Sequence, residues 1–146
     1  MISIKQINEK DIDLCYELDS NTISLWSKQQ WADEFKKEGI KVFGLSLANL
    51  LIGICVIHVI IDEAQINFFA INKKFRNKGL GSYFMGYLIE LCEKLNINKL
   101  LLEVSQSNIN AQSFYSHFDF FTVGVRRNYY KDGSNALLKE KKITDK

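Results

Sequence analysis

The stretch from Ala64 to Leu95 constrains the fold most, because it joins a strand, a basic loop with two glycines and a long helix. Gln65 to Ile71 is rich in Ile and Phe and contains no breaker, which predicts a strand. The loop that follows, at 73–81, places four cations in the six positions before its first glycine. The helix is predicted from apolar residues at the 3, 4, 7 spacing of one buried stripe. These residues are Leu80, Tyr83, Phe84, Tyr87, Leu88, Leu91 and Leu95.

A loop of this kind suits a phosphate or pyrophosphate. The first turn of a helix carries unpaired N–H groups and a partial positive charge, and glycines let an anion approach the backbone closely. The loop lacks the Gly-x-x-x-x-Gly-Lys-Ser/Thr pattern of a P-loop. It also lacks the third glycine and the later acidic residue of the dinucleotide-binding fingerprint. The spacing that remains is Arg76-x-x-Gly79-x-Gly81.

Periodicity along the chain predicts the order β-α-α-β-β-β-α-β-α-β-β, an α/β protein with a mixed sheet. Predicted strands cover 2–7, 41–47, 50–60, 65–71, 99–104, 120–130 and 135–143. The first helix begins at Asn8 or Lys10 and ends before a polar break at 19–22. Its apolar face is predicted to hold Ile12, Leu14 or Cys15, and Leu18. Later helices are expected from a capping box at Ser27–Gln30 to Gly39, over 80–95 and over 109–118.

Composition limits the functional class only loosely. The chain has 146 residues, 47% apolar and 25% charged, which predicts one globular domain over 1–146. A formal net charge of +2 is too small to indicate nucleic-acid binding by itself, although a basic tail is expected over about 139–146. Early charged residues interrupt any signal peptide, and no apolar run reaches the roughly 18–20 residues of a membrane span. A cytoplasmic protein is therefore expected.

Cysteine and histidine give no sign of a metal or redox site. Cys15, Cys55 and Cys92 lack ligand spacing and fall in apolar segments, so they are interpreted as small buried residues. His58 lies in an apolar strand and is expected in the core. Neither His58 nor His117 has the partners of a metal site or a Ser-His-Asp arrangement, and no metal is predicted.

The loop spacing resembles the acyl-CoA-binding loop of the GNAT N-acetyltransferases, whose pattern is Arg/Gln-x-x-Gly-x-Gly/Ala between a strand and a helix. The predicted order of elements matches the GNAT fold from end to end. The resemblance therefore implies a central mixed sheet of about seven strands flanked by about four helices, with acetyl-CoA as co-substrate.

The last third of the chain narrows the resemblance to the RimI-type subfamily, which acetylates the N-terminal alanine of small-subunit ribosomal protein eighteen. The matching segments are 102–115, the run Arg126-Arg127-Asn128-Tyr129-Tyr130, and Leu25-Trp26-Ser27. Three positions depart from the subfamily pattern. They are Asp119 in place of glycine, Asn72-Lys73 in place of Asp-Pro, and Asn135-Ala136 in place of Asp-Ala. Aspartate tolerates the left-handed conformation, so the change at 119 is expected to be harmless, whereas the change at 135 leaves a substrate or structural contact open.

Two residues are the candidates for acid–base chemistry. A peptide α-amino group has a pKa of about 7.7–8, so part of it is neutral near pH 7 and a modest base is enough. Glu103 is the candidate base, acting directly or through water, and burial is expected to raise its pKa. Tyr115 is the candidate acid that protonates the CoA thiolate, as the resemblance implies. The alternatives are a salt-bridged glutamate at a strand end and a tyrosine that only fills the core.

The resemblance also implies a donor site along the strand, the loop and the next helix. Backbone groups of Phe69, Ala70 and Ile71 would bind the pantetheine amides. The pyrophosphate would bind at Arg76, Asn77, Lys78, Gly79, Leu80, Gly81 and Ser82. Asn108 would bind the pantetheine arm, cap its helix, or do both. Lys73, Lys74 and Lys78 either attract the 3′-phosphate or form a solvated face.

Acceptor binding is assigned to Trp26, Arg127, Tyr129 and Tyr130, again by resemblance. Basic and aromatic residues interleaved on a strand could instead stack on RNA, which keeps Arg126 to Tyr130 open as a nucleic-acid surface. The expected activity is acetyl transfer to a protein N-terminal alanine, with a ribosomal protein as partner and no membrane. The rivals are a GNAT enzyme for lysine side chains or small amines, and a non-catalytic acyl-CoA-binding module. The sequence leaves the oligomeric state open, with a monomer as the simplest expectation.

Overall fold

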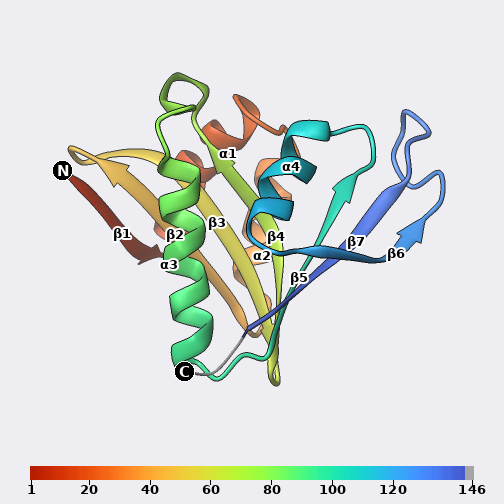
Figure 1. Ribbon diagram of the computed structural model, residues 1–146. Helices are drawn as coiled ribbons and strands as arrows, with labels where there is room; N and C mark the ends of the chain where they lie inside the picture. The colour runs from red at the N-terminus through yellow and green to blue at the C-terminus, as the bar shows by residue number, and fades with distance from the viewer. Residues whose placement is uncertain (144–146) are drawn as a thin grey trace.

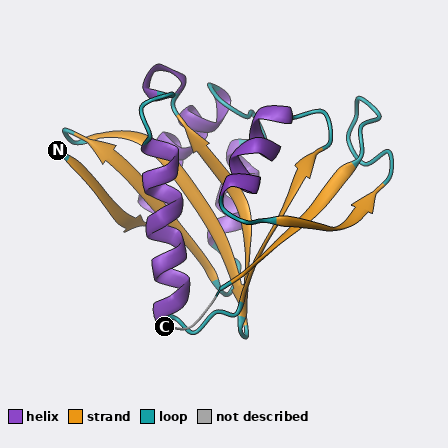
Figure 2. Ribbon diagram, viewed as in Figure 1, coloured by secondary structure: helices purple, strands orange, loops and turns teal. Residues whose placement is uncertain are grey.

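A seven-stranded mixed sheet carries helices on both faces (Figures 1 and 2). The structure is a computed structural model and describes residues 1–143. The strands run in the spatial order β1-β2-β3-β4-β5-β7-β6. Their bounds are β1 Ile2–Ile7, β2 Ile40–Leu47, β3 Leu50–Ile60, β4 Glu63–Ile71, β5 Lys99–Ser105, β6 Phe121–Arg126 and β7 Ala136–Lys142. The helices are α1 Ile12–Ser20, α2 Lys28–Phe35, α3 Leu80–Lys94 and α4 Ile109–His117, with 3-10 turns η1 Glu9–Asp11 and η2 Lys73–Phe75.

The mixed sheet joins two antiparallel parts through one parallel contact. Strands β1 to β4 pair antiparallel in chain order, and β7 pairs antiparallel with both β5 and β6. Between them, β4 and β5 pair parallel, as expected for two strands joined by a helical crossover, here α3. The mixed α/β architecture predicted from the order of elements is confirmed.

Each face of the sheet has its own hydrophobic cluster. One contains Phe84, Leu88 and other residues of α3 together with Leu100, Leu102 and Val104 of β5. The other contains Cys15 and Leu18 of α1, Trp31 of α2, and Phe68 and Ala70 of β4. In Figure 1, α3 and α4 accordingly cover one face of the sheet, and α1 and α2 cover the other.

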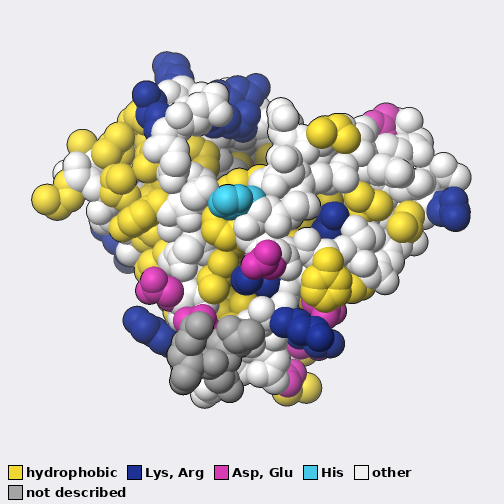
Figure 3. Space-filling view, in the orientation of Figure 1, with side chains coloured by type: hydrophobic (Ala, Val, Ile, Leu, Met, Phe, Trp, Pro, Cys, Tyr) yellow, Lys and Arg dark blue, Asp and Glu magenta, His cyan; other side chains and the backbone are white. Residues whose placement is uncertain are grey.

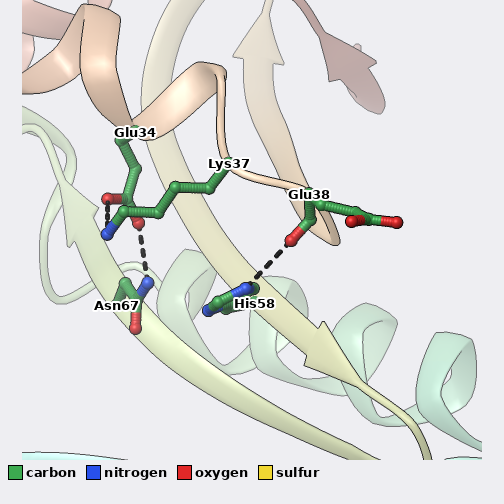
Figure 4. A network of polar contacts seen from close by, with 5 residues as sticks. All are labelled: Glu34, Lys37, Glu38, His58 and Asn67. Carbon is green, nitrogen blue, oxygen red and sulfur yellow. Dashed lines mark hydrogen bonds and ion pairs between the residues drawn. The ribbon is translucent and has the colours of Figure 1, made fainter.

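A β-bulge in β4 changes which residues face each cluster. The register shifts between Val56 and Ile57 of β3, so that Asn67 has no direct partner there. Its amide nitrogen donates to the buried Glu34 carboxylate of α2 at 2.7 Å, and Lys37 pairs with the same carboxylate at 2.8 Å (Figure 4). The bulge is therefore held by α2, and it re-aims the last part of β4.

The buried faces of α3 and α1 differ in part from the apolar faces predicted for these helices. In α3 the fully buried residues include Met85 and Cys92, whereas Tyr83 and Leu95 of the predicted stripe are exposed. A tyrosine can present its polar end to water, so periodicity alone misplaces the stripe by part of a turn. In α1, Cys15 rather than Leu14 faces inward. The capping box at Ser27 and Gln30 is confirmed.

Four further expectations need correction. The predicted strand at 120–130 ends at Arg126, and the chain turns at Arg127 and Asn128. The supposed polar break at 19–22 begins inside α1, where Asp19 is fully buried. The basic tail does not start at Lys139, because that residue is buried in β7 and donates to Thr122; residues 144–146 lie outside the described residues. His58 is only half-buried, with its ring near the Glu38 carbonyl oxygen at 3.0 Å (Figure 4).

The three cysteines are buried and unpaired, as predicted. Burial raises the thiol pKa of Cys15 to about 12 and that of Cys92 to about 11, and it also raises the pKa of Cys55. Only the thiolate is a strong nucleophile, so these side chains are chemically inert near neutral pH.

Candidate active site

Strands β4 and β5 separate before either of them ends. Their parallel pairing covers Glu63 with Lys99, Ala64 with Leu100 and Gln65 with Leu101, and then stops. Both strands continue, β4 to Ile71 and β5 to Ser105, and they diverge in Figure 1. The edge of β4 that faces β5 is therefore unpaired beyond Gln65. We call this region the strand separation; it is where backbone groups of β4 can bind an extended ligand.

The loop before α3 offers a row of unused donors at the end of β4. The backbone N–H groups of residues 77–82 donate to no acceptor within residues 1–143. The first backbone bond of α3 is from Tyr83 to the Gly79 carbonyl oxygen. Six consecutive free N–H groups at a helix N-terminus are donors that an anion could use, and anion binding at this loop stays a prediction.

Cations surround these donors. Lys73, Lys74, Arg76 and Lys78 are all exposed, and Lys and Arg side chains gather at the end of the molecule where α3 begins (Figure 3). Arg76 has a second function, because its Nε donates to the Ile71 carbonyl oxygen at 3.1 Å and so ties the loop to the end of β4. That carbonyl oxygen is thus already hydrogen-bonded, whereas the sequence placed Ile71 among the groups open to pantetheine.

The structure explains the two glycines of the loop in different ways. Gly79 has a φ of +77°, in the left-handed region that favours glycine. Gly81 has helical geometry, and a Cβ there would lie 3.5 Å from a ring carbon of Phe114, an ordinary contact. Gly79 is therefore needed for the turn of the loop, and position 81 needs only a small residue.

Glu103 projects from β5 towards the α1/α2 face. Leu102 and Val104 point into the cluster under α3, so the residue between them points to the opposite face. The Glu103 side chain is 21% exposed, and its Oε2 lies 3.3 Å from Nε of Arg126, whose side chain is 55% exposed. The structure thus shows the salt bridge of the alternative interpretation, and the deep burial expected for this carboxylate is not seen. A pair this exposed binds weakly, which leaves the carboxylate available to a ligand.

Tyr115 approaches from the other face. It lies in α4, half-buried, with its ring 5.3 Å from Phe114 and 5.5 Å from Phe120. Phe114 packs on Phe69 of β4 at 5.7 Å, so α4 reaches across the strand separation. Burial raises the pKa of Tyr115, with a smaller contribution from Cys55. The phenol is therefore protonated at neutral pH, the form that a general acid requires.

The C-terminus of α4 fixes this tyrosine. Phe120 N–H donates to the Tyr115 carbonyl oxygen at 3.1 Å, and Asp119 N–H donates to the Ser116 carbonyl oxygen at 3.0 Å. These are the two bonds of a Schellman motif, and the Tyr115–Phe120 ring contact is the hydrophobic pair that accompanies it. Asp119 occupies the left-handed position with a φ of 67°, as expected where the subfamily has glycine.

We expect Asp119→Gly to stabilise the protein by about 0.5–1 kcal/mol, because glycine adopts this φ without the steric cost of a Cβ. Asp119→Ala keeps the Cβ and loses the tolerance of aspartate for this conformation, so it should destabilise by about 1 kcal/mol. Urea unfolding of the three proteins measures both changes. A loss of stability in Asp119→Gly would show instead that the aspartate side chain makes a stabilising contact.

The hairpin between β6 and β7 is fixed to the end of β5. Asn135 accepts a hydrogen bond from Asn128 N–H at 2.9 Å and donates to the Gln106 side-chain oxygen at 2.9 Å. Its carbonyl oxygen also accepts from Gln106 N–H. The departure at 135 therefore makes a structural contact. Asn128 itself turns the chain with a φ of 52°.

This hairpin places aromatic side chains around Glu103. Arg126 lies 5.5 Å from the ring centroid of Tyr129, and the Tyr129 and Tyr130 rings are 5.1 Å apart. Burial raises the pKa of Tyr130, and the Glu103 carboxylate and Tyr129 raise it further. Arg127 is exposed in the turn. Because 127–130 form a turn and Arg126 pairs with Glu103, the interleaved strand proposed for RNA stacking is absent from the described residues.

Trp26 and Asn108 complete the predicted set. Trp26 is half-buried, 5.7 Å from Phe68 on the α1/α2 face of β4, which is the face that carries Glu103. Asn108 caps α4 by accepting from Ala111 N–H at 3.1 Å, so the capping function is confirmed and its side-chain nitrogen is left for a ligand. Sequence reasoning missed Asp19, which accepts from Trp26 N–H at 2.9 Å. Its position four residues after Cys15, on the buried side of α1, was the available signal.

Across 1–143, no three His, Cys, Asp or Glu side chains gather as a metal ion would require. Nor is any helix in that range long and apolar enough to cross a membrane.

Comparison with known proteins identifies the family. A family model described as Acetyltransferase (GNAT) family matches residues 7–120. A relative from Bacillus subtilis (strain 168), provisionally named ribosomal protein bS18-alanine N-acetyltransferase, is 32% identical over 139 residues, which cover 93% of this chain and 92% of the relative. The Escherichia coli (strain K12) protein named ribosomal protein bS18-alanine N-acetyltransferase is 28% identical over 131 residues, covering 89% and 88%.

A solved structure agrees with these relatives over the whole chain. The crystal structure of the ribosomal-protein-S18-alanine N-acetyltransferase from Escherichia coli matches with a TM-score of 0.93 at 27% identity, covering 100% of this chain and 96% of that one. The family model, the relatives and the fold agree, and the resemblance seen in the sequence is confirmed. The chain belongs to the GNAT family of acetyltransferases.

Proposed function

We propose that the chain transfers an acetyl group from acetyl-CoA to the N-terminal alanine of a protein, in particular small-subunit ribosomal protein S18, in the cytoplasm. One observation supports acetyl transfer most directly. A carboxylate and a protonated phenol come to the strand separation from opposite faces of the sheet, Glu103 from β5 and Tyr115 from α4. The names of relatives that match nearly the whole chain support the choice of acceptor.

The donor site follows from the loop and the open edge of β4. GNAT acetyltransferases use acetyl-CoA as co-substrate. The free N–H groups of 77–82 would bind its pyrophosphate, with Arg76 holding the loop and Lys73, Lys74 and Lys78 adding attraction for the 3′-phosphate. The unpaired edge of β4 at Phe69 and Ala70 would bind the pantetheine amides, and the free side-chain nitrogen of Asn108 would donate to the same arm. The thioester would then lie between α4 and β5.

The acceptor would enter on the face of α1 and α2. Trp26 lies on that face of β4, Tyr129 packs against the Arg126 side chain that pairs with Glu103, and Tyr130 follows in the same turn. The exposed Arg127 would extend this surface. The incoming amine would take the place of Arg126 on the Glu103 carboxylate, because an ion pair with an exposed arginine is weak and its partner is readily replaced. Glu103 then accepts the amine proton, directly or through one water, as nitrogen bonds to the acyl carbon.

The leaving group requires a proton as the carbon–sulfur bond breaks. Tyr115 is neutral and half-buried on the opposite face, and it gives its proton to the departing thiolate. Attack is direct, because the three cysteines are buried with raised pKa values and offer no nucleophile for an acyl-enzyme. The proton taken by Glu103 and the proton given by Tyr115 balance the reaction.

Peptide competition tests the acceptor. Purified full-length protein and acetyl-CoA are presented with peptides that begin with Ala, Ser or Met, and with an N-blocked peptide that contains an internal Lys. We expect the alanine peptide to have the highest kcat/KM, since the relatives are named for an alanine acceptor. All three α-amines should react faster than the lysine amine, which is neutral far less often near pH 7. A preference for lysine would overturn the assignment. Binding of acetyl-CoA without turnover on any amine would favour the non-catalytic module instead.

A further inference from the structure

The carboxylate of Asp19 organises the loop between α1 and α2. Asp19 is fully buried in the last turn of α1. Its Oδ1 accepts from Leu25 N–H at 2.7 Å, and its Oδ2 accepts from Trp26 N–H at 2.9 Å and from Trp31 Nε1–H at 2.9 Å. Within residues 1–143 no cation forms an ion pair with it. A buried carboxylate costs free energy unless donors surround it, and here all of its donors come from one short segment.

The bonds to Asp19 hold a backbone that has little other support. Ser24 has a φ of 56°, a left-handed conformation for a residue with a Cβ, and its N–H donates to the Asp19 carbonyl oxygen at 2.7 Å. Ile23 and Leu25 on either side are exposed. The packing of the loop against the protein is therefore concentrated at Trp26, with Asp19 as its anchor.

Trp26 connects Asp19 to the part of β4 that borders the candidate active site. Its ring packs edge-on against Trp31 at 4.8 Å and on Phe68 at 5.7 Å. Phe68 belongs to the part of β4 that has separated from β5, on the face towards which Glu103 points. The carboxylate thus fixes both the backbone of Trp26 and the indole against which Trp26 packs.

We propose that Asp19 is a positioning residue for the acceptor, which sets the place of Trp26 on the face of the sheet towards which Glu103 points and has no part in acetyl-CoA binding. The proposal deepens the proposed function and rests on it for the identity of the acceptor. The donor loop follows the C-terminal end of β4, and within residues 1–143 no hydrogen bond joins it to Asp19 or Trp26. A substitution at Asp19 should therefore change acceptor binding without changing acetyl-CoA binding.

Asp19→Asn tests this with almost no change in volume. An asparagine must place its NH₂ group against either the Leu25 N–H or the pair of donors at Oδ2, so at least one bond becomes a donor–donor contact. We expect KM for the alanine peptide to rise about tenfold or more, with KM for acetyl-CoA unchanged within about twofold. Asp33→Asn, the same change at an exposed position of α2, is the matched control and should leave both values unchanged.

A mutant cycle with Trp26→Ala separates positioning from a general loss of stability. If Asp19 acts through Trp26, the double variant should have the same peptide KM as Trp26→Ala alone. Independent effects that multiply, or equal losses for peptide and acetyl-CoA, would overturn the proposal. If Asp19→Asn does not fold, Trp31→Phe removes one of the three donors to Asp19 together with part of the buried indole ring, and it should raise the peptide KM about twofold to threefold in the same selective way.

Hydrogen exchange provides a measurement that needs no turnover. In Asp19→Asn the amides of Leu25 and Trp26 should exchange at least about tenfold faster, whereas those of α3 should not change. Unchanged exchange at Leu25 and Trp26 would overturn the proposal, whatever the activity. Failure of the proposed function looks different: wild type would not acetylate the alanine peptide, and the KM comparison would then use the amine that wild type does accept.

Discussion

Replacing Glu103 by Gln should lower kcat for the alanine peptide by about a hundredfold to a thousandfold, the usual contribution of a general base. Gln keeps the size and hydrogen-bonding shape of the side chain but cannot accept the amine proton. The defect should shrink as pH rises from about 7 to 9, because the acceptor amine, with a pKa of about 8, then loses its proton to solvent before it attacks. Steady-state rates across this range measure both effects.

The same substitution should leave the fold and the donor site intact. Glu103 pairs with an Arg126 side chain that is 55% exposed, and an ion pair of that kind contributes at most about 1 kcal/mol to stability. Affinity for acetyl-CoA should stay within a few-fold, because the N–H groups of 77–82 belong to the loop and first turn of α3 and not to β5. Glu90→Gln, at an exposed position of α3, controls for the change itself. Full activity in Glu103→Gln would show that this glutamate only forms the salt bridge.

The candidate donor site could be recognised in the sequence because its residues are local. Arg76, Gly79 and Gly81 lie within six residues, and a loop before a helix has its free N–H groups wherever that helix is placed. Two features of the site cannot be predicted from a local sequence pattern. The separation of β4 from β5 depends on where a parallel pairing stops, and the bulge at Asn67 depends on a carboxylate of α2. Both are contacts between residues distant in the sequence.

The acceptor half was predicted less well, for identifiable reasons. The strand predicted through Tyr130 ends at Arg126, because Asn128 adopts a left-handed conformation where no glycine or proline marks a turn. Asp19 looked like the start of a polar break, since an aspartate near a helix end is usually solvated. Its burial is explained only by the donors of Leu25, Trp26 and Trp31, which the fold brings to it. The contacts around Glu103 therefore needed the structure, whereas the choice of Glu103 as candidate base came from the sequence and stays a prediction.

Tyr115→Phe should lower kcat by about a hundredfold while the protein becomes no less stable. The substitution keeps the ring contacts with Phe114 and Phe120 and removes only the hydroxyl, which forms no hydrogen bond within residues 1–143. Removing a half-buried hydroxyl without a partner leaves no other group unsatisfied, so the free energy of unfolding should be unchanged or slightly higher. The lost activity would then reflect protonation of the thiolate alone. With a thioester whose leaving thiol is more acidic, Tyr115→Phe should recover part of the lost rate, because that thiolate leaves without being protonated.

The pH dependence of the free energy of unfolding tests whether the Tyr115 phenol is held in its protonated form. Burial raises the pKa of Tyr115 above its ordinary value of 10.0, so the native state keeps the phenol protonated where the unfolded chain ionises. This contribution to stability is fully present below about pH 10 and is lost as pH rises through the native pKa. Stability should therefore fall less steeply above pH 10 in Tyr115→Phe than in wild type. Tyr16→Phe, at an exposed position of α1, should keep the wild-type slope and rate. Equal slopes for wild type and Tyr115→Phe would show that the phenol has the same pKa in the native and the unfolded chain, and therefore that burial does not hold it in the protonated form.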